Sequence, residues 1–273
     1  MFFFQNIITD YPFLSLLISI LLFLGFNQLG EFIFYSKSLK KIVFGISDLK
    51  YQYTTFGLNI SLVFFFPISL FYNNANYIIF FYAIILIILG AYKCIFILLN
   101  FNLKYSIISK YNFDEILGIS LILALFLLSL SPITHADALD YHSYVAKYIL
   151  TKGSYPTNLE NILNVISGSG EVLIALGYSV GSEQISNLVQ FAGLLSLIGI
   201  LKKKGSYDII SLLLLLSIPV LVFFISSSKP QFFALCNNLL IIKLLISSNI
   251  KLSTSSNYKM IFILLSSIFL FNS

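Results

Sequence analysis

Long apolar runs recur along this chain, and they constrain its fold more than any other feature of the sequence. Hydrophobic residues make up 58% of the 273 residues, and charged residues only 10%. Several runs rich in Leu, Ile and Phe reach about 18 residues or more, which is enough to cross roughly 30 Å of hydrocarbon. They are continuous and lack the short alternating strands of a transmembrane barrel. The sequence therefore predicts an all-α, polytopic helical membrane protein.

We expect about eight membrane spans within a single integral membrane domain, residues 1–273. The expected spans are 12–33, 54–72, 77–99, 115–131, 184–201, 208–226, 231–248 and 260–273. They divide into N-terminal spans (1–114), a middle part with the fourth and fifth spans (115–201), and C-terminal spans (202–273). The last apolar run reaches Ser273, so the chain reads either as a fragment of a longer protein or as a shortened form.

The lysines predict how the spans are oriented. One alternating set of connections and span ends carries most of them, namely Lys37, Lys40, Lys41, Lys50, Lys93, Lys104, Lys110, Lys202, Lys203, Lys204, Lys243, Lys251 and Lys259. The opposite set carries only Lys147, Lys152 and Lys229. By the positive-inside rule the first set is cytoplasmic, so the N-terminus and the 132–183 connection lie outside the cytoplasmic membrane. The net charge of +5 follows from this orientation, and we expect no nucleic-acid partner.

The long outer connection, 132–183, is expected to carry amphipathic surface helices. Pro132 ends the fourth span, and Thr134 is a good cap for a helix over about 135–151. Ala138, Tyr141, Val145 and Ile149 recur at helical spacing on one face, while Asp140, Ser143 and Lys147 are expected to face elsewhere. Lys152 and Gly153 supply its stop. A second short helix is expected after Pro156, and the apolar segment 171–180 is too short to span the bilayer.

Both histidines of the chain and two aspartates lie in one short polar stretch, residues 134–142. Asp137 and Asp140 are three residues apart, so a helix places them on one face. One carboxylate can then accept a proton from a hydroxyl nucleophile while the other binds substrate or a cation. Two structural roles compete with this interpretation: Asp137 as a cap carboxylate favoured by the helix dipole, and Asp140 as a solvated charge.

A four-ligand metal site is disfavoured, because on a straight helix His142 points away from both Asp137 and Asp140. We predict no bound metal and no cofactor, while a divalent cation held by Asp137 and Asp140 is left open. Glu171 follows Gly168-Ser-Gly170 and has two equal interpretations. Its side chain reaches an outer cavity shared with Asp137 and Asp140, or it only places a negative charge at a helix N-terminus. In the first span, Asn27, Gln28 and Glu31 are expected to make interhelical contacts.

The stretch Asp137-Ala-Leu-Asp-Tyr-His142, just outside a span and followed by Tyr155-Pro156, resembles the first outer loop of GT-C type polytopic membrane glycosyltransferases. That superfamily includes protein O-mannosyltransferase-like and aminoarabinose-transferase-like enzymes. The chain is more closely similar to bacterial membrane proteins of the superfamily with an Asp-x-Leu-x-Tyr-His stretch and a later Gly-x-Gly-Glu pattern, matched here at 168–171. The resemblance covers about residues 130–200.

The resemblance implies transfer of a sugar from a polyprenyl-phosphate-linked donor to a glycan, lipid or protein acceptor at the outer membrane surface. Its acidic base carries over to Asp137 or Asp140. Tyr141, His142, Glu171 and Lys152 are the expected substrate-binding residues, with membrane lipid around them. The chain departs from the usual pattern in two respects. Three spans precede the span that leads into the loop, and the C-terminal spans and any soluble domain expected from the resemblance are missing from the sequence.

A different class of protein also fits the composition, namely a non-catalytic transporter or flippase-like protein for a lipid-linked or small polar solute. Such a protein is expected to carry ionisable groups near the membrane midplane and broken helices in both halves. The middle segments of the expected spans are nearly bare of charge. The sequence therefore favours the enzyme.

Overall fold

A computed structural model describes residues 11–35, 49–101, 113–136, 138–156, 168–201, 213, 217–227 and 229–248. Throughout these residues the secondary structure is helical, with no strand. The elements are α2 (Pro12–Tyr35), η1 (Leu49–Gln52), α4 (Tyr53–Phe71), α5 (Ala75–Phe101), α6 (Phe113–Ser129), η3 (Ala138–His142), α7 (Ser143–Lys152), α9 (Gly170–Ser179), α10 (Ile185–Leu201), α12 (Pro219–Ser226) and α13 (Gln231–Ser248). The all-α prediction is confirmed for this part of the chain.

Three of the described helices are long and apolar enough to cross a membrane: Pro12–Phe32, Lys50–Phe71 and Ala75–Asn100. Helices α12 and α13 together give a fourth candidate, although they are bent by 114° at the break between them. Helices α6 and α10 are apolar but shorter. Helices α2, α4, α5, α6, α10 and α13 coincide with expected spans to within a few residues, whereas the expected span 260–273 and most of 208–218 lie outside the described residues.

Helix α2 packs tightly between α4 and α5 because glycines let the backbones touch. A Cβ atom on Gly25 would lie 2.1 Å from the carbonyl oxygen of Leu86, and one on Gly90 would lie 1.8 Å from that of Leu21. On the other side of α2, a Cβ on Gly57 would lie 2.0 Å from the carbonyl oxygen of Phe26. Small residues at helix crossings are a common means of packing in membranes, where lipid offers no hydrophobic drive for helices to associate.

Helix α10 is buried along most of its length and is tied to its neighbours by polar side chains. At its start, Gln184 Oε1 accepts hydrogen bonds from Ser15 and Ser19 of α2, at 3.2 and 3.0 Å. Further along, Gln190 Oε1 accepts the Phe233 amide of α13 at 2.9 Å, and Ser196 donates to Gln52 Oε1 at 2.6 Å. Such hydrogen bonds between helices add specificity to an apolar bundle, because they form only when the helices are correctly aligned.

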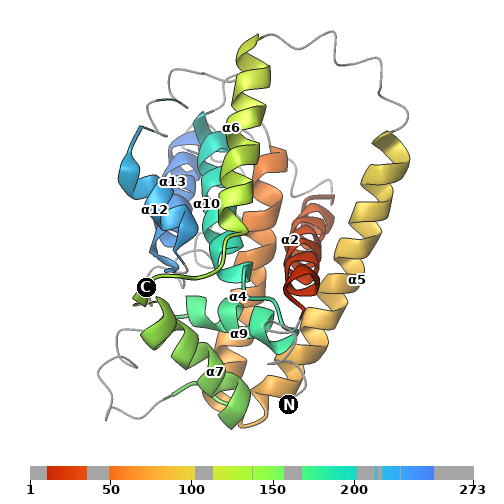
Figure 1. The fold of residues 1–273 in the computed structure, drawn as a ribbon, viewed down its shortest axis with the longest axis vertical. Coiled ribbons are helices and arrows are strands. Elements are labelled where there is room, and N and C mark those ends of the chain that lie inside the picture. The colour runs from red at the N-terminus through yellow and green to blue at the C-terminus, as the bar shows by residue number, and fades with distance from the viewer. Residues whose placement is uncertain are drawn as a thin grey trace.

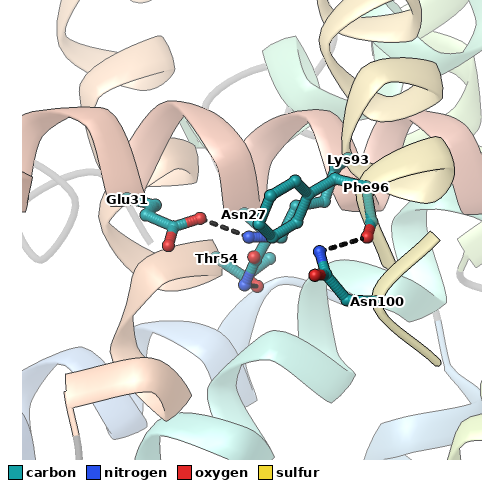
Figure 2. A network of polar contacts seen from close by, with 6 residues as sticks. All are labelled: Asn27, Glu31, Thr54, Lys93, Phe96 and Asn100. Atoms are coloured by element: carbon teal, nitrogen blue, oxygen red, sulfur yellow. Dashed lines mark hydrogen bonds and ion pairs between the residues drawn. The ribbon is translucent and has the colours of Figure 1, made fainter. Parts of the chain in front are cut away.

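The bundle has two distinct ends. Helices α2, α4, α5, α6 and α10 run along the long axis of the molecule, and α7 and α9 lie across one end of them (Figure 1). We call this the loop end. At the opposite, lysine end, Lys93 of α5 forms an ion pair with Glu31 of α2, and Asn27 donates to Thr54 Oγ1 at 3.0 Å (Figure 2). The predicted interhelical contacts of Asn27 and Glu31 are thereby confirmed.

Candidate functional site

The polar stretch forms a π-helical turn instead of the regular α-helix that its spacing predicts. Helix α6 ends at Ser129, residues Ala138–His142 form the π turn η3, and α7 continues to Lys152. The expected helix over 135–151 is therefore present but interrupted at its first turns. Single π turns within helices occur frequently at functional sites, because they redirect side chains. Asp137 lies outside the described residues, so its predicted role stays a prediction.

The turn directs neighbouring side chains to different environments. Asp140 is exposed, whereas His142 keeps only 3% of its surface accessible. The two side chains therefore lie in different surroundings, while the angle between them that a straight helix predicts stays a prediction. The half-buried ring of Tyr141 lies over the imidazole, with the two ring centroids 4.0 Å apart. Neither Asp140 nor Tyr141 is thereby assigned a role, and the predictions for both remain open.

His142 is held by Glu171, 29 positions later in the chain. His142 Nδ1 lies 2.5 Å from Glu171 Oε1, and the other carboxylate oxygen, Oε2, accepts the Gly168 amide at 2.9 Å. Glu171 is completely buried in the first turn of α9. Its position at a helix N-terminus is confirmed, whereas its reach into an outer cavity stays a prediction, because the side chain it meets is the buried His142.

The connection is fixed to the bundle by the segment that follows α7. Gly153, with φ +79°, ends α7 by donating its amide to the Ile149 carbonyl at 2.9 Å, as the Lys152-Gly153 stop predicts. Tyr155 then donates its backbone amide to the Ser69 carbonyl at 2.6 Å and its hydroxyl to the Gly168 carbonyl at 2.9 Å. Gly168 is the residue whose amide holds Glu171. The corner at Tyr155 thus links the end of α4 to the start of α9.

Helix α7 is amphipathic as expected, with Val145 and Ile149 buried and Lys147 exposed. The prediction for Ser143 is wrong, because Ser143 is buried. Its hydroxyl shares a hydrogen bond of 2.8 Å with the Tyr178 hydroxyl of α9, and this partner compensates for removing a serine from water. Burial raises the pKa of Tyr178 to about 12, so the phenol stays protonated at neutral pH.

The short apolar segment after Gly168 forms α9, which is buried against α4, α5, α7 and α10. The second short helix expected after Pro156 falls in 157–167, outside the described residues. Lys152 is exposed at the end of α7, and its substrate-binding role stays a prediction. His135 contacts the ring of Phe223 at a centroid distance of 4.5 Å, in surroundings different from those of His142.

Two polar atoms at this site are buried and lack a hydrogen-bond partner in the described structure: His142 Nε2 and Ser169 Oγ. Ser169 is the N-cap residue of α9, yet its side chain makes no capping hydrogen bond. Sequence reasoning did not single out Ser169; a serine directly before a helix-opening Gly-Glu was the available signal. Across the described residues, no group of three or more His, Cys, Asp or Glu side chains is arranged to hold a metal ion.

Residues 92–273, about two thirds of the chain, match a protein family model described as the DUF1420 N-terminal domain. The matched region begins within α5 and includes the whole loop end from η3 to α9. No curated protein and no solved structure matches the chain.

Proposed function

We propose that this chain, which belongs to the family of the DUF1420 N-terminal domain, is a membrane glycosyltransferase of the GT-C type. The observation that carries the proposal is the pairing of buried His142 with Glu171, at one end of an apolar bundle. Buried ionisable groups are costly in such surroundings, and functional sites are where they are usually retained. One residue of the loop motif, His142, thus meets the glutamate of the Gly-x-Gly-Glu stretch.

The proposed setting is the cytoplasmic membrane, crossed by eight spans, with the loop end facing outwards. A polyprenyl-phosphate-linked sugar then lies with its lipid chain along the apolar bundle and its phosphate at the interface. The acceptor is a hydroxyl-bearing glycan, lipid or protein outside the cell. This arrangement accounts for the gathering of polar side chains at the loop end, while long apolar side chains such as Phe81 and Ile88 of α5 are exposed along the bundle.

The reaction is a single displacement at the anomeric carbon. Asp137 or Asp140 accepts the proton of the acceptor hydroxyl as its oxygen forms the new glycosidic bond. The bond between the anomeric carbon and the phosphate oxygen breaks, and its electrons leave with the polyprenyl phosphate. A lysine at the loop end, with Lys152 as the candidate, stabilises the negative charge of that leaving group. Tyr141, His142 and Glu171 shape the sugar site.

The test is release of polyprenyl phosphate from polyprenyl-phosphate hexoses by the full chain in nanodiscs supplied with cell-envelope acceptors. D137N is expected to abolish release, and D140N to lower it by roughly a hundredfold or more if Asp140 shares the base role. E115Q is the matched control, because Glu115 stands in the first turn of α6, at the lysine end. Near-native release by D137N and D140N alike would reject aspartate catalysis, and no release by the wild type with any donor would reject the transferase.

A transporter or flippase for a lipid-linked solute is the second candidate, favoured by two observations. The ion pair between Glu31 and Lys93 joins two candidate spans, and α12 and α13 meet at a sharp break. Glu31 and Lys93 nevertheless belong to the last third of their helices, away from the middle of the bundle. Movement of a fluorescent lipid-linked sugar across proteoliposomes without release of polyprenyl phosphate would establish the transporter.

A further inference from the structure

We propose that His142 Nε2 and Ser169 Oγ form a recognition site for a sugar hydroxyl, with Glu171 as the positioning residue. This inference rests on the proposed function and specifies one part of its substrate site. The evidence is the pair of unpartnered polar atoms at the start of α9, both on residues that are at least 97% buried. Buried polar atoms without a partner are uncommon in proteins and call for an explanation.

The first step concerns the imidazole. Glu171 cannot turn freely, because the Gly168 amide holds Oε2 and His142 Nδ1 meets Oε1. A carboxylate accepts hydrogen bonds, so the ring proton belongs on Nδ1. In the proposed site Nδ1 keeps this proton, and Nε2 presents its lone pair to the ligand. A group that donates a hydrogen bond would then satisfy Nε2.

The second step concerns Ser169. N-cap serines ordinarily use their oxygen to accept an amide of the first helical turn, but Ser169 makes no such bond. Its hydroxyl is therefore available as a donor. Ser169 stands between Gly168 and Gly170, in the same turn that holds Glu171 and, through it, the imidazole. In the proposed site a ligand hydroxyl would donate to Nε2 and accept from Ser169, whereas a phosphate at neutral pH offers mainly acceptors and would meet the Glu171 carboxylate.

The third step concerns access. The imidazole is covered by the half-buried ring of Tyr141, whose centroid lies 4.0 Å from that of His142. Entry of a hydroxyl therefore requires the Tyr141 ring to move away. Sugars carry several hydroxyls and an apolar ring face that packs on aromatic side chains, so a displaced Tyr141 offers a second contact to the same ligand.

The test exploits the fact that the chain has only two histidines. We would label histidine with ¹⁵N in the full chain in nanodiscs, assign His142 with H135Q, and record the imidazole nitrogen resonances. His142 is expected to be neutral with its proton on Nδ1 and a non-protonated Nε2. Addition of methyl glycosides should move the Nε2 resonance to lower frequency, as acceptance of a hydrogen bond does, while His135 stays unchanged.

Two variants, S169A and E171Q, separate the roles, and S179A and H135Q are their controls. S169A should weaken the apparent affinity for the glycoside roughly three- to tenfold, the loss of one neutral hydrogen bond, without changing the tautomer. S179A is its matched control, because Ser179 is a buried α9 serine that bonds only to its own helix, at the Leu176 carbonyl. E171Q should mix the two tautomers of His142 and weaken glycoside binding. The H135Q background should behave as wild type.

The outcomes are distinct from those of the transferase assay. The hydroxyl site is overturned if His142 carries its proton on Nε2 or is an imidazolium at neutral pH. It is overturned equally if Nε2 is already hydrogen-bonded to trapped water and no glycoside moves it, or if sugar-free polyprenyl phosphate alone produces the shift. Release of polyprenyl phosphate with no shift of the Nε2 resonance would support the transferase and reject the hydroxyl site. A shift of the Nε2 resonance with no release would support the hydroxyl site and reject the transferase.

Discussion

The ammonium group of Lys93 and the carboxylate of Glu31 join α5 to α2 three residues beyond Gly90, where the backbones of the two helices touch (Figure 2). The side chains are 15% and 34% exposed, which places the pair between a surface ion pair and a fully buried one. Removing one partner therefore leaves a partly desolvated charge. The pair thus joins α2 and α5 at the lysine end.

K93M is expected to lower the free energy of unfolding by about 1 to 2 kcal/mol, because it leaves the Glu31 carboxylate without its ion-pair partner. The double variant E31Q/K93M should recover most of this loss, since neither charge then remains. Unfolding by sodium dodecyl sulfate in mixed micelles, followed by circular dichroism, measures both. The control K147M, at an exposed lysine of α7, should unfold as wild type; an equal loss there would refute a specific role for the ion pair.

Gly25 and Gly57 are expected to tolerate no side chain. A methyl group at either position would approach a carbonyl oxygen of the neighbouring helix to 2.1 Å or 2.0 Å, so G25A or G57A must push α2 away from α5 or α4. We expect each to cost about 1 to 3 kcal/mol or more in the same unfolding experiment. G193A should be milder, because its nearest neighbour, Phe233 Cα, is 3.1 Å away. If G193A costs more than G25A and G57A, the backbone contacts do not hold the bundle.

The raised pKa of Tyr178 predicts that the free energy of unfolding decreases at alkaline pH. Its folded pKa is raised to about 12, mainly by burial, from an ordinary value of 10. The stability that comes from keeping the phenol neutral is therefore fully present below pH 10, and it is lost as the pH rises towards 12. Comparing wild type with Y178F, the wild type should lose roughly 2 to 3 kcal/mol more over that interval. Parallel curves for the two proteins would contradict this assignment.

The orientation of the two ends can be tested with single cysteines. Thr151 is exposed on α7 at the loop end, and Lys50 is exposed at the lysine end. In a background lacking Cys94 and Cys236, T151C is expected to react with a membrane-impermeant maleimide in intact cells, and K50C only after permeabilisation, because lysine-rich ends remain in the cytoplasm. The reverse labelling pattern would invert the proposed topology and place the candidate site in the cytoplasm.

Much of the local structure could be predicted from the sequence, because it depends on neighbours along the chain. Apolar runs gave helices close to the expected bounds, and Lys152-Gly153 correctly marked the end of α7. Helical periodicity also predicted the buried face of α7, with Val145 and Ile149. The π turn η3 left no clear signal, since one extra residue per turn is decided by packing on both sides of it.

The fate of Ser143 illustrates what local pattern misses. Its position on the helix predicted exposure. The Tyr178 hydroxyl of α9, 35 positions later, instead supplies a hydrogen bond that compensates for removing Ser143 from water. The same holds for Ser169, which looks like an ordinary N-cap and yet leaves its hydroxyl unused. Spacing within one helix cannot reveal which polar atoms another helix will satisfy.

By itself, the sequence determined that this is a helical chain of the kind that spans membranes. It also placed both histidines in one long connection and most of the lysines in others. These properties follow from composition and periodicity, which act within single helices. Only the tertiary structure decided that His142 meets Glu171, and that two hydrogen-bonding atoms beside them stay unsatisfied. The reason is physical: a side-chain pair 29 positions apart forms only when α7 and α9 are packed together across the end of the bundle, and such packing depends on all the helices at once.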